Sequence, residues 1–341
     1  MEHLTQQKQN MRWCLVELLV FSTALFQNAQ CLVVRLASWN LLAQCYAKPT
    51  KYPWCNPSHL EWEYRKSLIV PKILEMDADV ICLQEVQVDL WPELMDTFRS
   101  HQYTGVLQNV TRGHNVASAI LIRDSSCFEF KRLESRSRVL IGVLQDKRST
   151  YKKAQKMYLC NVHLEAGEKD GDNLQRYHQL KSLFKRLTNQ VHRDQIPVED
   201  ASIMIAGDFN MLRKSPLHTF LSQGLLQSPE QIKNLPPAST IKLFDAYLDP
   251  QRTPADSTLQ PIPCKLCYDD NHCNQGLTER KPLERTYAFG EVLDYCWHSR
   301  ALRIRDTLLF HPLASTKLPQ KWPSDDHPSD HLPIGVDFEW E

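Results

Sequence analysis

Polar residues end five apolar, strand-like runs that are spread along nearly the whole chain. The runs end, in chain order, at Ser38-Trp39-Asn40, Gln84-Glu85, Gly207-Asp208-Phe209-Asn210, Leu293-Asp294 and Ser329-Asp330-His331. Each ending supplies a carboxylate, a carboxamide or an imidazole. A carboxylate at the end of a buried strand costs free energy unless it is paired or coordinated. A chain that ends five strands in this way is therefore expected to gather these ends into one polar, metal-binding site.

Strand-like and helix-like segments are mixed along the chain without strict alternation. Strands are predicted at residues 33–39, 79–83, 117–122, 139–144, 156–162, 201–206, 291–298, 304–310 and 332–338. Helices are predicted at residues 62–76, 91–99, 173–191 and 216–221. This order predicts an α/β (α+β) fold in which two packed, mixed β-sheets carry helices outside, within one domain rather than two.

The overall composition is that of an ordinary globular protein. Hydrophobic residues make up 42% and charged residues 23% of the chain, which is enough apolar material for a sizeable core. The formal net charge is zero, so no basic field over the whole protein indicates nucleic acid as a partner. Charge can still be concentrated locally around a site, so the composition weakens that class of function without excluding it.

The N-terminal segment resembles a secretory signal, because a mostly apolar run from Trp13 to Phe26 follows Lys8 and Arg12. Glu17 within this run counts against a signal. About 14 apolar residues are too few for a membrane-spanning helix, which needs roughly 20, so no transmembrane segment is predicted. Residues 1–31 are a candidate signal peptide, mitochondrial presequence or plain extension, and residues 32–341 form the domain. The protein would be secreted if the segment is cleaved as a signal, and otherwise mitochondrial or cytoplasmic.

One motif at a strand end carries groups suited to phosphate chemistry. Asp208 and Asn210 have the i, i+2 spacing that puts both side chains on one side of an extended chain. The acid could orient or activate water, and the carboxamide could donate to a phosphate oxygen. Taken alone, this motif could be a turn, and Glu85 could be a solvated strand-end glutamate. His163 ends a further strand, although a lone histidine is more often structural than catalytic.

Asp294 and the Asp330-His331 pair could form a carboxylate–imidazole couple, in which the acid fixes the tautomer and raises the basicity of the ring. The oxygen-rich set of candidate ligands contains no cysteine, which points to Mg²⁺ or Mn²⁺ rather than zinc. Each candidate has an ordinary structural explanation when it is taken alone. All of them together are hard to explain without a site.

A separate cysteine-rich stretch contains Cys264, Cys267, His272 and Cys273. It looks like a metal knuckle, but its spacing is irregular for zinc. A disulfide or a plain loop is the favoured interpretation.

Six motifs in this order resemble those of the endonuclease/exonuclease/phosphatase superfamily. They are Asn40 in Ser-Trp-Asn-Leu-Leu, Glu85 in Leu-Gln-Glu-Val, His163 in Asn-Val-His-Leu, Gly207-Asp208-Phe209-Asn210, Asp294 in Leu-Asp-Tyr, and Ser329-Asp330-His331. The resemblance covers roughly residues 33–339 and implies a DNase I-like fold, a four-layered α/β sandwich. The stretches that begin at Trp39 and at Arg65 look most like the CCR4/nocturnin/Angel branch of RNA-processing enzymes.

The resemblance implies a Mg²⁺ (or Mn²⁺) site in which Glu85 is the main ligand, helped by Asn40 and Asp330. It also implies that Asp208 orients or deprotonates the attacking water and that Asn210 holds the scissile phosphate.

The same resemblance implies that His163 and His331 stabilise the pentacovalent phosphate, with Asp294 orienting His331. This set suits the reaction, because phosphoryl transfer needs charge neutralisation and in-line positioning more than it needs a covalent nucleophile.

The substrate is indicated less clearly than the chemistry. Phe289 lies five residues before Asp294, where deadenylase relatives carry an aromatic that stacks on adenine, an interaction of about 1–3 kcal/mol per base. Phe289 could equally be a core or loop aromatic. The segment after His163 lacks the aromatic and proline that are usual in the deadenylase branch. No leucine-rich repeat precedes the domain, so docking into the CCR4–NOT complex by that route is not indicated.

The sequence as a whole predicts a Mg²⁺-dependent phosphodiesterase that hydrolyses RNA as a deadenylase-like 3′–5′ exoribonuclease and acts as a monomer. One alternative is a phosphatase or phosphodiesterase that acts on nucleotides, inositol phosphates or sphingomyelin. A second alternative, from a different class, is a catalytically inactive RNA-binding module.

Overall fold

The computed structural model describes residues 33–110, 113–148, 155–223, 241–248, 286–288, 291–310 and 321–340. The N-terminal segment 1–31, Phe289 and the cysteine-rich stretch 264–273 lie outside the described residues, so the predictions made for them stay predictions. Within the described ranges, no helix has both the length and the apolar character needed to cross a membrane.

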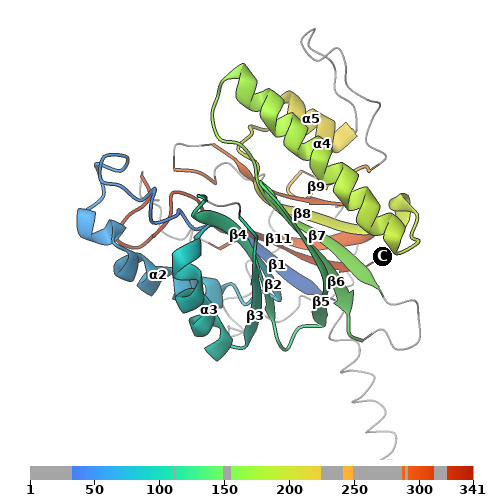
Figure 1. The fold of residues 1–341 in the computed structure, drawn as a ribbon, viewed down its shortest axis with the longest axis horizontal. Helices are drawn as coiled ribbons and strands as arrows, with labels where there is room; N and C mark the ends of the chain where they lie inside the picture. Colours follow the sequence, from blue (N-terminus) through green and yellow to red (C-terminus); the bar gives the residue numbers. More distant parts are fainter. Residues whose placement is uncertain are drawn as a thin grey trace, which may run out of the picture.

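Two six-stranded β-sheets form the centre of the molecule (Figure 1). The first sheet contains, in spatial order, β11 (Leu302–Leu309), β12 (Ile334–Trp340), β1 (Val34–Asn40), β2 (Val80–Gln87), β4 (Val116–Arg123) and β3 (Tyr103–Leu107). The second contains β5 (Phe128–Arg136), β6 (Val139–Asp146), β7 (Lys156–His163), β8 (Ser202–Asp208), β10 (Asp294–His298) and β9 (Phe244–Asp245). Both sheets are mixed, because β1 pairs with β2 and β7 pairs with β8 in parallel while the other pairs are antiparallel.

Apolar side chains from both sheets fill the space between them. The cluster includes Cys82 and Ile120 from the first sheet and Leu159 and Met204 from the second, all completely buried. Removal of this surface from water is the main favourable contribution to folding. The opposite faces of the two sheets are covered by helices. Because the central strands are buried on both faces, they are nearly continuous apolar runs in the sequence.

Helices cover the two outer faces of the sheets (Figure 1). α2 (Trp62–Glu75) and α3 (Trp91–Ser100) pack on the first sheet, and α4 (Asp170–Arg193) and α5 (Pro216–Gln223) pack on the second. Three short 3₁₀ helices, η1 (Pro57–Leu60), η2 (Val88–Leu90) and η3 (Val198–Asp200), lie between these elements. The resulting order of helix, sheet, sheet and helix is the four-layered sandwich predicted from the sequence.

The pattern of apolar residues in α4 explains its place. Leu180, Leu183, Leu187 and Val191 recur at helical spacing and are all buried against the second sheet. At the start of this helix, the Asp172 carboxylate accepts a hydrogen bond from the Lys169 backbone N–H at 3.0 Å. This bond gives the N-terminal end a partner that the helix itself cannot supply.

The nine predicted strands and four predicted helices are all present, with ends that differ by a few residues. Strand β10 begins at Asp294, three residues later than the predicted start of that run. The strands β3, β5 and β9 were not predicted from the sequence. β5 is an edge strand whose exposed face carries charged residues such as Glu129, so it lacks an apolar run. β3 and β9 are short, with five and two residues.

Candidate active site

The pairing of the strands brings the predicted site residues to one edge of the sandwich. Asn40, the last residue of β1, pairs with Gln84, which precedes Glu85 on the parallel strand β2. On the second sheet, Asp208 pairs with His163 of β7 on one side and with Asp294 of β10 on the other. Register therefore sets three site residues side by side that lie far apart in the sequence.

Glu85 lies at an irregularity in β2. The pairing of β2 with β4 shifts register between Leu83 and Val86, and Glu85 has a φ of +53°, in the left-handed region. Such a backbone costs a residue other than glycine about 1–2 kcal/mol, and strain of this kind is concentrated at functional sites. The Glu85 Oε2 atom accepts a hydrogen bond from the Ala43 backbone N–H at 2.9 Å. The bulge thus turns a carboxylate out of the sheet toward the loop that follows β1.

The backbone before Asp208 requires glycine. Gly207 has a φ of +140°, and a Cβ built on it would lie 2.0 Å from the Val162 carbonyl oxygen. Only a residue without a side chain lets β8 lie this close to β7. After the strand, the Asn210 backbone N–H donates to Asp208 Oδ1 at 2.9 Å, and the Asn210 amide donates to the Leu164 carbonyl at 3.0 Å.

The buried carboxylate of Asp208 is contacted from both sheets. The Asn40 amide donates to Asp208 Oδ2 at 3.0 Å and to Glu85 Oε1 at 3.2 Å. The His331 and His163 Nε2 atoms lie 3.6 Å and 3.8 Å from the same Asp208 oxygen. Burial raises the pKa of Asp208, against the lowering effect of the nearby His331. A carboxylate in this state is a stronger base than an exposed aspartate.

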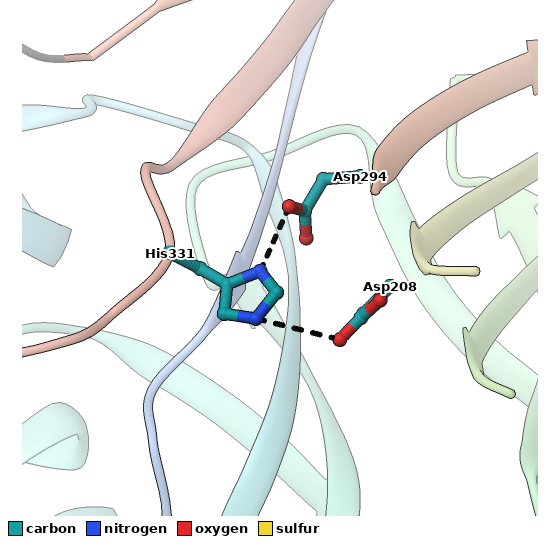
Figure 2. A group of neighbouring side chains, drawn as sticks. All are labelled: Asp208, Asp294 and His331. Carbon is teal, nitrogen blue, oxygen red and sulfur yellow. Dashed lines mark hydrogen bonds and ion pairs between the residues drawn. The ribbon is translucent and has the colours of Figure 1, made fainter. Parts of the chain in front are cut away.

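His331 lies between two carboxylates (Figure 2). Its Nδ1 is 2.9 Å from Asp294 Oδ2, and its Nε2 faces Asp208. Burial opposes protonation of the ring, but the charges of Asp294 and Asp208 raise the pKa of His331 to about 10. The structure thus forms the carboxylate–imidazole couple predicted from the sequence. With this pKa, both ring nitrogens of His331 are protonated at neutral pH and the ring is positively charged.

His163 has the opposite protonation state. Its Nε2 lies 3.7 Å from Glu85 Oε1, between the carboxylates of Glu85 and Asp208. Burial lowers the pKa of His163 despite the nearby charge of Asp208. The site therefore holds one neutral and one charged imidazole, and the two face the same Asp208 oxygen.

Asp330 is held by residues that the sequence reading did not select. The Tyr52 hydroxyl donates to Asp330 Oδ2 at 2.7 Å, and the Lys51 ammonium lies 3.6 Å from the same oxygen. Tyr52 is completely buried, and burial together with the charge of Asp330 raises its pKa far above the usual value. Tyr52 and Asp330 are 278 positions apart in the sequence, and no local pattern around Tyr52 marks it as a partner of Asp330.

Arg65 also supports the site and is completely buried. Its guanidinium donates to the Pro328 carbonyl at 2.8 Å, to the Gln44 side chain at 3.0 Å, and to the Leu41 and Leu42 carbonyls. It thereby ties the loop after β1 to the loop that carries Asp330.

A signal for Arg65 was present in the sequence. Arg65, Ile69 and Ile73 are spaced four residues apart on one face of α2, and all three are buried. A charged residue on the apolar face of a helix is unusual unless it has partners. Burial lowers the pKa of Arg65 to about 10, which leaves the side chain a cation at neutral pH.

Among the residues that the structure describes, two sets of side chains are considered as candidates to hold a metal ion. Asp208, Asp294 and His331 offer ligand atoms within 4.8 Å of one another. His331 would have to give up the proton that both carboxylates stabilise before its nitrogen could coordinate an ion.

Glu85 and Asp330 form the second group and have no such obstacle. Burial and the charge of Asp330 raise the pKa of Glu85, so two carboxylates repel each other where a cation would relieve the repulsion. Hard carboxylate oxygens of this kind suit a divalent cation such as Mg²⁺. The Asn40 amide nitrogen donates to Glu85 and to Asp208, while its oxygen accepts a hydrogen bond from the Leu42 N–H at 3.0 Å.

Comparison with known proteins identifies one family model and several relatives that this chain resembles. A family model described as the Endonuclease/Exonuclease/phosphatase family matches residues 37–331. The chain is 23% identical over 343 residues to the CCR4-Not complex 3'-5'-exoribonuclease subunit Ccr4 of Candida albicans. The aligned region covers 89% of this chain and 40% of that protein. It is 26% identical to carbon catabolite repressor protein 4 homolog 3 of Arabidopsis thaliana, over 90% of this chain and 75% of the relative.

Solved structures share the fold. The crystal structure of ANGEL2, a 2',3'-cyclic phosphatase, matches with a TM-score of 0.68 at 20% identity and covers 91% of this chain and 96% of that one. Neighbours of this kind have DNase I-like folds, which confirms the predicted architecture. The chain spans less than half the length of the Ccr4 relatives that it matches.

Proposed function

This chain belongs to the endonuclease/exonuclease/phosphatase family, and we propose that it is a Mg²⁺-dependent phosphodiesterase that hydrolyses RNA from the 3′ end. The family membership agrees with the resemblance seen in the sequence. The activity and the RNA substrate are supported by relatives named as exoribonucleases and as 2',5'-phosphodiesterase 12 of Homo sapiens, which is 24% identical over 91% of this chain.

One observation carries the proposal. The Asp208 carboxylate is contacted by Asn40 from the first sheet, by His163 from the second, and by His331 from the loop before β12. Asp208 therefore lies where both halves of the sandwich meet. Its neighbours include the neutral imidazole of His163 and the charged imidazole of His331. Phosphodiester hydrolysis requires a base for water beside donors for the phosphate oxygens.

Glu85 and Asp330 are the residues that would hold Mg²⁺. Asn40 would assist them, since its amide lies between the carboxylates of Glu85 and Asp208. Such an ion supplies neutralisation of charge on the phosphoryl oxygens. Tyr52 and Arg65 fix the position of Asp330 from behind, so the two ligand carboxylates would need little rearrangement on binding.

Asp208 would orient the attacking water and accept its proton, because burial raises its pKa above that of an exposed aspartate. The protonated His331, held by Asp294, would donate a hydrogen bond to a phosphate oxygen and stabilise its developing charge. Neutral His163 would donate from the opposite side. Asn210 has a second amide hydrogen beyond the one given to Leu164 and would use it for the scissile phosphate.

Cleavage assays with the purified protein test this proposal. With Mg²⁺, a 5′-labelled RNA should shorten one nucleotide at a time from its 3′ end, whereas internal cuts would contradict the assignment. Asp208→Asn should lower kcat by a factor of about 10²–10⁴, because it removes the base. Asp96→Asn, at an aspartate whose side chain is 75% exposed on α3, is the matched control and should leave the rate unchanged.

The same assay separates the alternatives. Substrates should include oligo(A), mixed RNA, DNA, nucleotides, inositol phosphates and sphingomyelin. If none is cleaved while the wild type and Glu85→Ala bind RNA equally, the protein is an RNA-binding module and not a hydrolase.

A further inference from the structure

A cavity of about 450 Å³ lies outside the candidate active site, between α4 and the hairpin that joins β5 to β6. Three arginines line it, Arg136 and Arg138 from the hairpin and Arg186 from α4. We call it the arginine cavity. None of the predicted catalytic residues lines it, and the proposed reaction does not use it.

The arginine cavity adjoins the catalytic end of β7. The Arg138 carbonyl oxygen accepts a hydrogen bond from the His163 backbone N–H at 3.0 Å. The Arg138 guanidinium pairs with Glu165 at 2.6 Å, and Glu165 follows His163 by two positions. The arginine cavity therefore borders the end of β7 that carries His163.

The arginines are held in place but not fully neutralised. Arg136 and Arg186 share one carboxylate, that of Glu134, at 3.0 Å and 3.5 Å. Gln190 donates to the other oxygen of Glu134 at 2.8 Å, which fixes the carboxylate between the two guanidiniums. Glu134 and Glu165 together balance two of the three arginine charges. The side chains of Arg136 and Arg186 are 44% and 39% exposed, so both can reach a ligand.

Two further features of the arginine cavity favour an anion with an apolar part. The first turn of the long helix α4 contributes Gly171, and apart from its chain neighbours and the backbone of its own helix no heavy atom lies within 4 Å of the position that its Cβ would occupy. The backbone N–H groups of a helix start carry partial positive charge. Leu174 also lines the cavity and is 43% exposed, which leaves apolar surface beside the guanidiniums.

We propose that the arginine cavity binds the sugar–phosphate backbone of single-stranded RNA on the 5′ side of the nucleotide that is removed. The proposal rests on the function proposed above, since the polarity follows from cleavage at the 3′ end. Guanidinium groups match phosphate oxygens in two-point hydrogen bonds, and Leu174 provides a surface for a ribose or base. An RNA chain is favoured over an acidic protein because the scissile phosphodiester that Asn210 and His331 would bind continues into further phosphates, and the arginine cavity adjoins the strand end that carries His163.

Binding measurements on the full chain test the arginine cavity directly. An Asp208→Asn background prevents cleavage, and fluorescence anisotropy gives Kd for a 12-nucleotide RNA and for a dinucleotide. The double change Arg136→Gln and Arg186→Gln should reduce the advantage of the long RNA over the dinucleotide by about tenfold, since each removes a charged hydrogen bond. The slope of log Kd against log salt for the long RNA should become shallower by about 1.4, because each single-strand phosphate contact contributes about 0.7.

A matched control removes the same charge elsewhere. Arg99→Gln with Arg300→Gln changes two exposed arginines on α3 and at the turn between β10 and β11, and it should alter neither the ratio nor the slope. Replacement of Arg136 and Arg186 by lysine should keep the salt slope, because the charges remain. Melting curves of all variants show whether they are folded.

The outcomes separate this proposal from the one that it rests on. An unchanged ratio and slope in the folded double variant would overturn the arginine cavity as an RNA site, while cleavage by the wild type would still stand. If polyglutamate of equal charge displaces the long RNA equally well, the cavity is a general anion site and the proposal fails. If the wild type cleaves no RNA of any length, the proposed function itself fails.

Discussion

At the level of single residues, the site depends on backbone conformations that most side chains avoid. Glu85, Gly207 and Asn210 all have positive φ, at +53°, +140° and +48°. Glu85 lies at the irregularity within β2, and Gly207 and Asn210 lie on either side of Asp208 at the end of β8. Strain of about 1–3 kcal/mol at such a position persists only when the surrounding structure enforces it.

Gly207→Ala is expected to destabilise the protein by about 3 kcal/mol or more, because the added Cβ would clash with the Val162 carbonyl and its φ is unfavourable for alanine. Urea denaturation measures the change in the free energy of unfolding. Gly171→Ala is the matched control, since its Cβ meets nothing within 4 Å and alanine is favoured in a helix by about 1 kcal/mol. An equal loss in both variants would show that the close approach of β8 to β7 is not the cause.

Glu85→Gln tests the proposed cation site without any measurement of activity. The melting temperature of the wild type should rise with Mg²⁺, by the equivalent of about 1.4 kcal/mol at ten times Kd. The variant should lose this rise and should be at least as stable as the wild type without Mg²⁺, because a buried carboxylate with a raised pKa is removed. Glu63→Gln, at an exposed glutamate of α2, should behave like the wild type. A Mg²⁺ response that persists in Glu85→Gln would place the ion elsewhere.

At the level of elements, the pattern of apolar residues predicted the strands that are buried on both faces and the helices that have one continuous apolar face. α4 is the clearest case, since its buried leucines recur at helical spacing. β5 escaped prediction because its stability comes from pairing and charged contacts. Arg132 of β5 and Lys156 and Tyr158 of β7 all contact Asp194, the residue that follows α4.

Asp194→Asn is expected to lower the free energy of unfolding by about 2 kcal/mol at pH 7. Burial opposes the charge of Asp194, but hydrogen bonds from Arg132, Lys156 and Tyr158 hold its pKa well below the usual range. This stabilisation is complete above the unfolded pKa of about 3.9 and is lost as pH falls toward the folded pKa.

The difference between wild type and Asp194→Asn should therefore shrink at pH 3, as measured by urea denaturation at both pH values. Asp96→Asn, in an exposed ion pair on α3, serves again as control and should stay within about 0.5 kcal/mol of the wild type. A difference that is the same at pH 3 and pH 7 would contradict the role given to the ionised carboxylate.

At the level of the whole molecule, a buried polar network joins the two sheets beneath the site. The Asn161 amide of β7 donates to the Leu83 and Ala119 carbonyls of the first sheet at 2.9 Å and 2.8 Å. Gln84 donates to Asn161 Oδ1 at 2.8 Å and to Ser38 Oγ at 3.1 Å. Since Gln84 precedes Glu85 and Asn161 lies two residues before His163, this network sets the distance between the two halves of the site.

Asn161→Leu should cost roughly 3 kcal/mol of stability, because the buried Leu83 and Ala119 carbonyls lose the hydrogen bonds that Asn161 donates and the Gln84 amide loses one of its acceptors. It should also weaken the Mg²⁺-dependent cleavage, since Glu85 and His163 would no longer be held at a fixed separation. Calorimetric melting and the cleavage assay measure the two effects. Asn109→Leu, at an exposed position, is the comparison variant, and a similar loss there would rule out the network as the cause.

Much of this protein could be inferred from residues alone, because the relevant signals are local. The apolar runs predicted nine strands and four helices, and the polar residues that end those runs predicted Asn40, Glu85, Asp208 and His331 as parts of one site. Strand propensity and the spacing of Asp208 and Asn210 act within a few residues, so they are visible without the fold.

The tertiary structure decided which of these groups touch and what protonation states they take. It set His331 between Asp294 and Asp208, and it placed Tyr52 and Arg65 behind Asp330. It also set the arginine cavity beside His163, through a hairpin strand that the sequence did not reveal. These arrangements depend on sheet pairing and register between segments far apart in the chain. They also depend on burial, which lowers the pKa of His163, and on the charges of Asp294 and Asp208, which raise the pKa of His331 against the effect of burial. No local pattern carries that information.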